Sequence, residues 1–81
     1  MLNLEVRTKL KEKEVLENAK KFFGVGGLGL EVREDGPDCL TFQGGGGYAS
    51  VSVCREDDKT RVSLVTQEWE MQVRNFAATL P

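Results

Sequence analysis

Histidine is absent from this 81-residue sequence, and cysteine occurs only twice, as Cys39 and Cys54. Without histidine the chain lacks the side chain most often used as a general base, as a zinc ligand or as the activating partner of a cysteine nucleophile. Two cysteines are also too few for the disulfide framework of a small secreted protein. We therefore expect two reduced thiols, no metal site, no cofactor and no enzymatic activity.

Long apolar runs and a surplus of basic residues are missing as well. No run approaches the roughly 20 apolar residues that a bilayer requires, and the N-terminus alternates apolar and charged residues where a signal peptide has an apolar block. Eleven Lys and Arg stand against 13 Asp and Glu, which is not the basic footprint of a protein that binds phosphate backbones. We expect a cytoplasmic, soluble chain that binds neither membrane nor nucleic acid.

The residues that are present predict one folded domain, residues 1–81, because 40% are hydrophobic and 30% charged, as in ordinary globular domains. Residues 2–7 alternate apolar and polar side chains, which is typical of a strand with one buried face. From about Lys11 to Phe23 apolar residues return every three or four positions, as on one side of a helix. Gly24 is expected to end this helix as a left-handed cap.

Four short strands are expected next, each bounded by turn residues. The first carries Leu28, Leu30 and Val32 on one face, the second and third cover 39–43 and 48–54, and the fourth is centred on residues 62–64. Because the apolar faces of the second and third strands must coincide, Leu40 should oppose Val51 or Val53.

The last segment returns to helical spacing. Its apolar residues fall on one stripe, and Thr66 can serve as the N-cap. That stripe consists of Trp69, Val73, Phe76, Ala77 and Leu80. The element order is therefore strand, helix, four strands, helix.

This order resembles the TATA-box-binding-protein-like, or helix-grip, architecture across the whole chain. The resemblance implies an α+β fold of β-α-β-β-β-β-α order, with an antiparallel five-stranded sheet of order 1-5-4-3-2 and both helices on one face. No sequence motif of that group occurs here, so the resemblance assigns no functional residue. Its DNA-binding members use apolar wedges on the open sheet face, whereas the open face expected here carries hydroxyls and mixed charges.

Two glycine clusters interrupt the pattern. Gly24–Gly29 matches the dinucleotide fingerprint G-x-G-x-x-G, but the glycines follow a helix and precede a strand, which is the reverse of the arrangement that binds a pyrophosphate. We interpret them as a helix-to-strand connection. Gly44–Gly47 joins two strands and is interpreted as a mobile hairpin tip, with a backbone docking site as the alternative.

Cys39 and Cys54 fall on the two strands that this tip joins. One register places them directly opposite, where a cross-strand disulfide is feasible, and a register shifted by two residues places them diagonally, where it is not. The alternation of side chains leaves both registers open.

Two functions of different class are consistent with this pattern. The first is an interaction module that forms a homodimer, or binds another protein, through an open sheet face poor in charge or, in the homodimer, through the edge strand of that sheet. Its candidate interface residues are Thr41, Tyr48, Ser50, Ser52 and Ser63. The alternative is a small hydrophobic-ligand-binding domain of helix-grip type. Its pocket would be lined by Phe42, Trp69, Val73 and Phe76.

Overall fold

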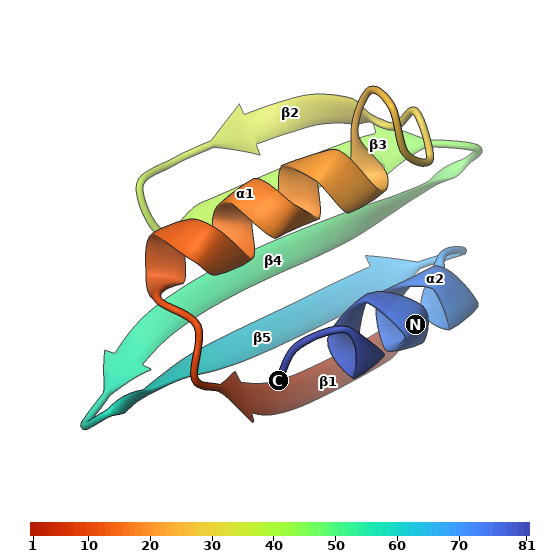
Figure 1. Ribbon diagram of the computed structural model, residues 1–81. Coiled ribbons are helices and arrows are strands. Elements are labelled where there is room, and N and C mark those ends of the chain that lie inside the picture. The colour runs from red at the N-terminus through yellow and green to blue at the C-terminus, as the bar shows by residue number, and fades with distance from the viewer.

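The computed structural model describes all residues, 1–81, and confirms the expected order of elements (Figure 1). The strands are β1 (Leu2–Thr8), β2 (Glu31–Asp35), β3 (Cys39–Gly44), β4 (Gly47–Glu56) and β5 (Lys59–Gln67), and the helices are α1 (Glu12–Phe23) and α2 (Glu70–Ala78). Neither helix has the length and apolar character needed to cross a bilayer.

The five strands form one antiparallel sheet in the order β1-β5-β4-β3-β2, as expected. Leu40 lies opposite Val51, which is one of the two pairings that the alternation allowed. β1 pairs with β5 without interruption, from Leu2 opposite Thr66 to Thr8 opposite Thr60. The first strand of the chain therefore forms one edge of the sheet, beside the last strand.

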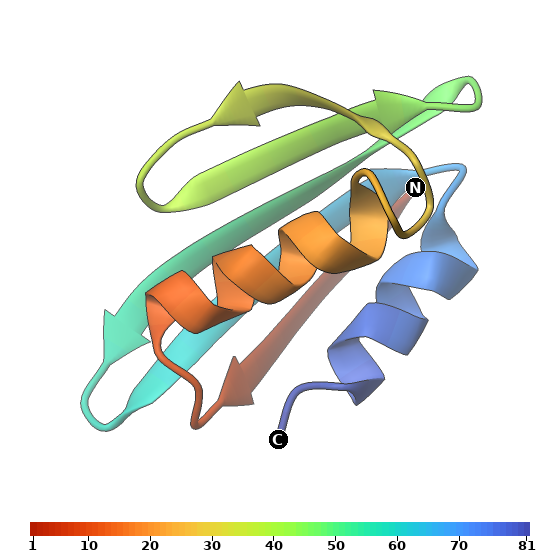
Figure 2. The ribbon, with the colours of Figure 1, turned by 45° about the horizontal axis from the view of Figure 1, so that its top comes forward.

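Both helices cover the same face of the sheet, as the two ribbon views show (Figures 1 and 2). Period-two alternation brings the apolar residues of β3, β4 and β5 to this face, where helix residues at three- and four-residue spacing pack on them. The ring of Phe23 lies 5.4 Å from that of Phe42 and 5.3 Å from that of Phe76, so α1, β3 and α2 meet at one aromatic cluster. The fully buried apolar residues include Val15, Ala19, Phe23, Leu40, Phe42, Ala49, Val51, Val62, Leu64, Val73 and Phe76.

Three threonines lie within this face, although threonine was not expected there. The hydroxyl of Thr8 donates to the carbonyl of Pro81 at 2.9 Å, and that of Thr60 donates to the carbonyl of Leu10 at 2.7 Å. Each buried hydroxyl therefore has a partner, which removes the free-energy cost of burying it. The first bond also holds the C-terminal Pro81 beside the sheet, and the second holds Leu10 of the connection between β1 and α1.

The expectation that Thr66 is the N-cap of the last helix is wrong. Thr66 lies within β5 opposite Ala49, and its hydroxyl donates to the carbonyl of Tyr48 at 2.7 Å. Pairing with β4 continues to Gln67, so the helix begins later and Trp69 occupies the N-cap position.

The segment between α1 and β2 also differs from expectation. Gly24 has φ −88° and is not a left-handed cap; the left-handed positions are Gly26 and Gly29, with φ of 94° and 77°. The N–H of Leu30 bonds to the carbonyl of Phe23, which ties this segment to the helix end instead of to β3. It does connect a helix to a strand, as the order of elements required.

The first strand of the meander is shorter than expected, because β2 begins only at Glu31 and pairs with β3 through a bulge between Val32 and Glu34. Leu28, Leu30 and Val32 therefore do not share a buried face. Leu30 is buried, but the side chains of Leu28 and Val32 are exposed.

Candidate interaction surface

The face of the sheet without helices carries the residues that alternate with the core. Odd-numbered residues of β3 and β5 and even-numbered residues of β4 point to this side, so Ser50 lies between Thr41 and Val65, and Ser52 lies between Cys39 and Ser63. We call these six residues the hydroxyl patch. All six are half-buried, and none is charged. The register therefore brings Thr41, Ser50, Ser52 and Ser63 together, as their alternation predicted.

Charged side chains lie at one end of the open face, beyond the hydroxyl patch. Arg7 and Arg61 are directly opposite each other on β1 and β5. The carboxylate of Glu56 lies between them, with Oε1 3.0 Å from Arg7 Nε and Oε2 3.1 Å from Arg61 Nη1. This carboxylate offsets the repulsion between two like charges on neighbouring strands.

Neutral polar side chains lie at the other end. Tyr48 is half-buried, and on its neighbouring strands it is opposite Gln43 and Gln67. Tyr48 thus belongs to the open face together with the hydroxyl patch, although at its margin. An aromatic ring with a hydroxyl at the rim of a polar surface is typical of protein interfaces.

The two cysteines lie on the same face and are both free. Cys39 is opposite Ser52, so Cys54 is diagonal to it. This is the register in which a cross-strand disulfide is not expected, because diagonal side chains are farther apart than a disulfide allows.

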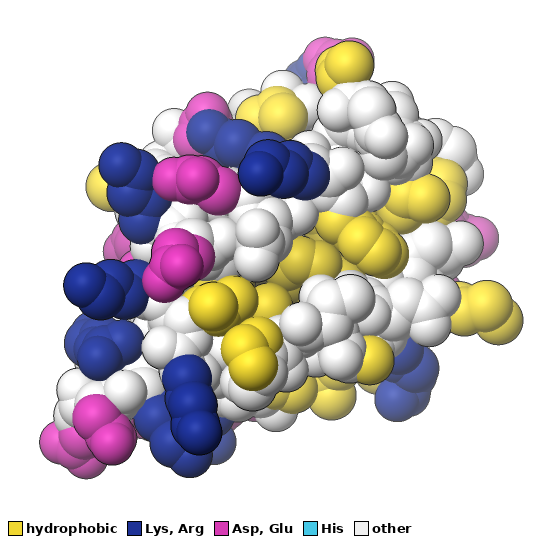
Figure 3. All heavy atoms as spheres, in the orientation of Figure 1, with side chains coloured by type: hydrophobic (Ala, Val, Ile, Leu, Met, Phe, Trp, Pro, Cys, Tyr) yellow, Lys and Arg dark blue, Asp and Glu magenta, His cyan; other side chains and the backbone are white.

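The residues of the alternative ligand pocket fill the core. Phe42 and Val73 are fully buried, Phe76 is 1% exposed, and no cavity is lined by them together. Of the four, only Phe76 borders a hollow, one of about 370 Å³ between α1 and α2. Apolar side chains are visible between the two helices there (Figure 3).

Trp69, the fourth residue of that set, packs on the four-glycine hairpin tip. Its indole Nε1 donates to the carbonyl of Gly44 at 2.9 Å, and a Cβ built on Gly45 would lie 2.7 Å from the indole Cζ2. The tip is therefore a docking site for a side chain of the same chain. Sequence reasoning noted the need for close approach at glycine but could not identify Trp69 as the group that approaches.

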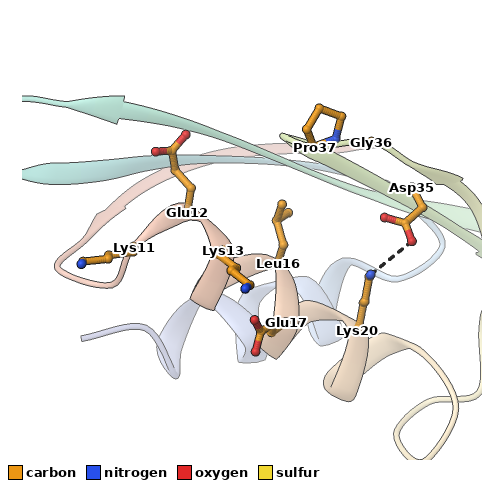
Figure 4. A pocket seen from close by; sticks show the side chains of 9 residues that line it. All are labelled: Lys11, Glu12, Lys13, Leu16, Glu17, Lys20, Asp35, Gly36 and Pro37. Carbon is orange, nitrogen blue, oxygen red and sulfur yellow. Dashed lines mark ion pairs between the residues drawn. The ribbon is translucent and has the colours of Figure 1, made fainter.

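The larger hollow, of about 600 Å³, lies between α1 and the turn that joins β2 to β3 (Figure 4). Lys20 closes one end through an ion pair with Asp35, Nζ to Oδ2 3.1 Å, while Leu16 lies along the helix wall. Three lysines and three carboxylates line it, so their charges balance, and both partners of the ion pair are about half exposed. This hollow selects no ligand by charge.

Comparison of the sequence with protein-family models and with curated proteins gave no match.

Proposed function

We propose that this chain is a small interaction module that associates with a second copy of itself through the open sheet face. The observation that carries this proposal is the hydroxyl patch, which extends across β3, β4 and β5 without a charged side chain. Solvated sheet faces ordinarily carry Lys, Glu and Arg, whereas depletion of charge is characteristic of the centre of an interface.

The surroundings of the patch support the same function. Arg7, Arg61 and Glu56 lie beyond one end, and the polar side chains of Tyr48 and Gln43 lie beyond the other. A charge-free centre with a polar and charged rim is the usual arrangement of a protein interface. Because one patch occupies the middle of one face, a two-fold axis can place it against itself.

The dimensions of the molecule are compatible with such a contact. It extends 36 × 21 × 18 Å, so its broadest side is comparable with the roughly 800 Å² that each partner contributes to a standard interface. A stable contact would therefore use most of the open face, including the hydroxyl patch and Tyr48.

Sedimentation of a Ser52→Arg/Ser63→Glu variant tests the proposal. The two residues are opposite each other on β4 and β5, so the introduced charges pair within the chain while adding charge to the interface. The new arginine also offsets the repulsion between the new carboxylate and Glu5, which lies opposite position 63 on β1. We expect this variant to sediment with a lower mass than the wild-type assembly at high micromolar concentration, because the open-face contact is lost.

A matched control adds the same two charges elsewhere. Met71 and Asn75 are exposed residues one turn apart on α2, and a Met71→Glu/Asn75→Arg variant should sediment like the wild type. A wild-type chain that stays monomeric, or an interface variant with unchanged mass, would contradict the proposal.

The cysteine thiols provide an independent measurement. Cys39 lies within the hydroxyl patch, and Cys54 lies on the same face. We expect a thiol reagent to modify both more slowly in the wild type at concentrations where it is associated than after dilution. Equal rates at the two concentrations would show that this face stays in contact with solvent.

A further inference from the structure

The two edges of the sheet differ in how far they oppose pairing with another strand. β2, at one edge, has only five residues, all exposed, and a bulge between Val32 and Glu34. Four of its five side chains are charged, and Glu31 and Arg33 form an ion pair along the strand. Short length, a bulge and charged side chains are the devices by which proteins prevent edge-to-edge association.

β1, at the opposite edge, is neither short nor interrupted by a bulge. It is seven residues long, contains no proline or glycine, and keeps an unbroken register with β5 from Leu2 to Thr8. Leu2, Leu4 and Val6 remain partly exposed on the helix-covered side. A long, regular edge with apolar side chains is a template on which another strand can pair.

We propose that β1 pairs antiparallel with β1 of a second copy, which joins two sheets edge to edge around a two-fold axis. The helix-covered faces of both copies then lie on the same side, so Leu4 and Val6 extend one apolar layer into the next. This contact is separate from the face-to-face contact of the proposed function, and the two together would produce an assembly larger than a dimer.

The charges of β1 favour a second copy as the occupant and select one register. Glu5 and Arg7 lie on the open-face side of β1, two residues apart. When Val6 is opposite Val6 of the second copy, Glu5 of each copy is opposite Arg7 of the other, and both pairs are favourable. When Glu5 is opposite itself, two like charges meet. When Leu4 is opposite itself, Glu5 is opposite Asn3 and no ion pair forms.

Charge reversal tests both the edge and the register. All variants are made with Ser52→Arg/Ser63→Glu, which removes the face-to-face contact, so any remaining dimer must use another surface. In this background we expect the chain to sediment at twice the monomer mass. Adding either Glu5→Arg or Arg7→Glu should return it to the monomer mass, because each change places like charges opposite each other at both pairs.

An equimolar mixture of the Glu5→Arg and Arg7→Glu chains should restore the dimer, because every pair in the mixed dimer is again of opposite charge. Thermal melts of each chain separate loss of association from loss of folding, since Arg7 also pairs with Glu56 within the chain. A monomeric background chain would overturn the edge proposal and leave the open-face proposal standing. A background dimer that ignores both charge reversals, or a mixture that stays monomeric, would also overturn the edge proposal.

Discussion

Alternate residues of the same strands point to opposite faces of the sheet, and the two faces differ in how deeply their side chains are buried. Phe42 on the helix-covered face is fully buried and contacts Phe23, whereas its neighbour Thr41 on the open face is half-buried and bonds weakly to Glu34 and Ser50. Stability is therefore concentrated on the helix-covered face.

The largest expected difference between the faces comes from truncating these two neighbours. Phe42→Ala leaves a cavity at the aromatic cluster and should lower the free energy of unfolding by about 3–5 kcal/mol. Thr41→Ala removes a half-exposed side chain and should change it by no more than about 0.5 kcal/mol. Urea titration of both variants measures the contrast, and similar losses would show that the open face also stabilises the fold.

Two neighbouring glycines of the hairpin tip also differ in whether they are packed against another side chain. Gly45 has φ 59° and lies against the Trp69 indole, whereas Gly46 has φ 82° and no atom near its Cβ position. Gly46→Ala should lower the free energy of unfolding by about 1–2 kcal/mol, because alanine must adopt the left-handed backbone conformation there but meets no other atom.

Gly45→Ala should cost more than that, because the indole must also move. We expect a lower melting temperature than for Gly46→Ala, together with a change in tryptophan fluorescence. Equal melting temperatures would mean that Trp69 does not hold the tip.

Hydroxyl groups occur on both faces, and only those of the buried face should matter for stability. Thr66→Val leaves the carbonyl of Tyr48 without its partner at a buried position and should cost about 1–2 kcal/mol. Thr66→Ser keeps the donor and is the control for shape. Thr41→Val on the open face should be near neutral, and a comparable loss there would contradict the division between the faces.

The smallest expected effect belongs to neither face. The pKa of Glu70 lies below its usual range, chiefly because its carboxylate accepts a hydrogen bond from its own backbone N–H. Desolvation partly offsets this shift, and the Glu68 N–H and the Met1 ammonium group lower the pKa a little further. A lowered pKa in the folded state means that the ionised group stabilises the fold above its ordinary pKa and loses this contribution as the pH falls. The melting temperature of Glu70→Gln should be slightly lower than that of the wild type near neutral pH, and the difference should vanish in acid.

The alternation of side chains was sufficient to predict most of the sheet. β4 and β5 are long and keep a strict period of two, so the sequence determined which residues of each strand face the helices and which form the hydroxyl patch. The same parity allowed two partners for Leu40, and only the length of the hairpin tip decided between them.

The errors occurred where local patterns competed with pairing at a distance. Leu28 and Val32 alternate with Leu30 as in a strand, but the hydrogen bond from Leu30 to Phe23 and the bulge at Val32 displace them from the core. Thr66 has the chemistry of an N-cap, yet pairing with β4 retains it in the sheet. The pairing of Thr66 depends on β4, which lies far along the chain and which no local pattern includes.

The pairing of β1 with β5 also determines when the fold can be completed during synthesis. Leu2 lies opposite Thr66, so β1 must remain without its partner until β5 has been synthesised and has left the ribosome. Contacts between such distant residues close large loops and slow folding. During this interval the apolar side of β1 is exposed, and binding of β1 by another nascent chain would compete directly with completion of the sheet.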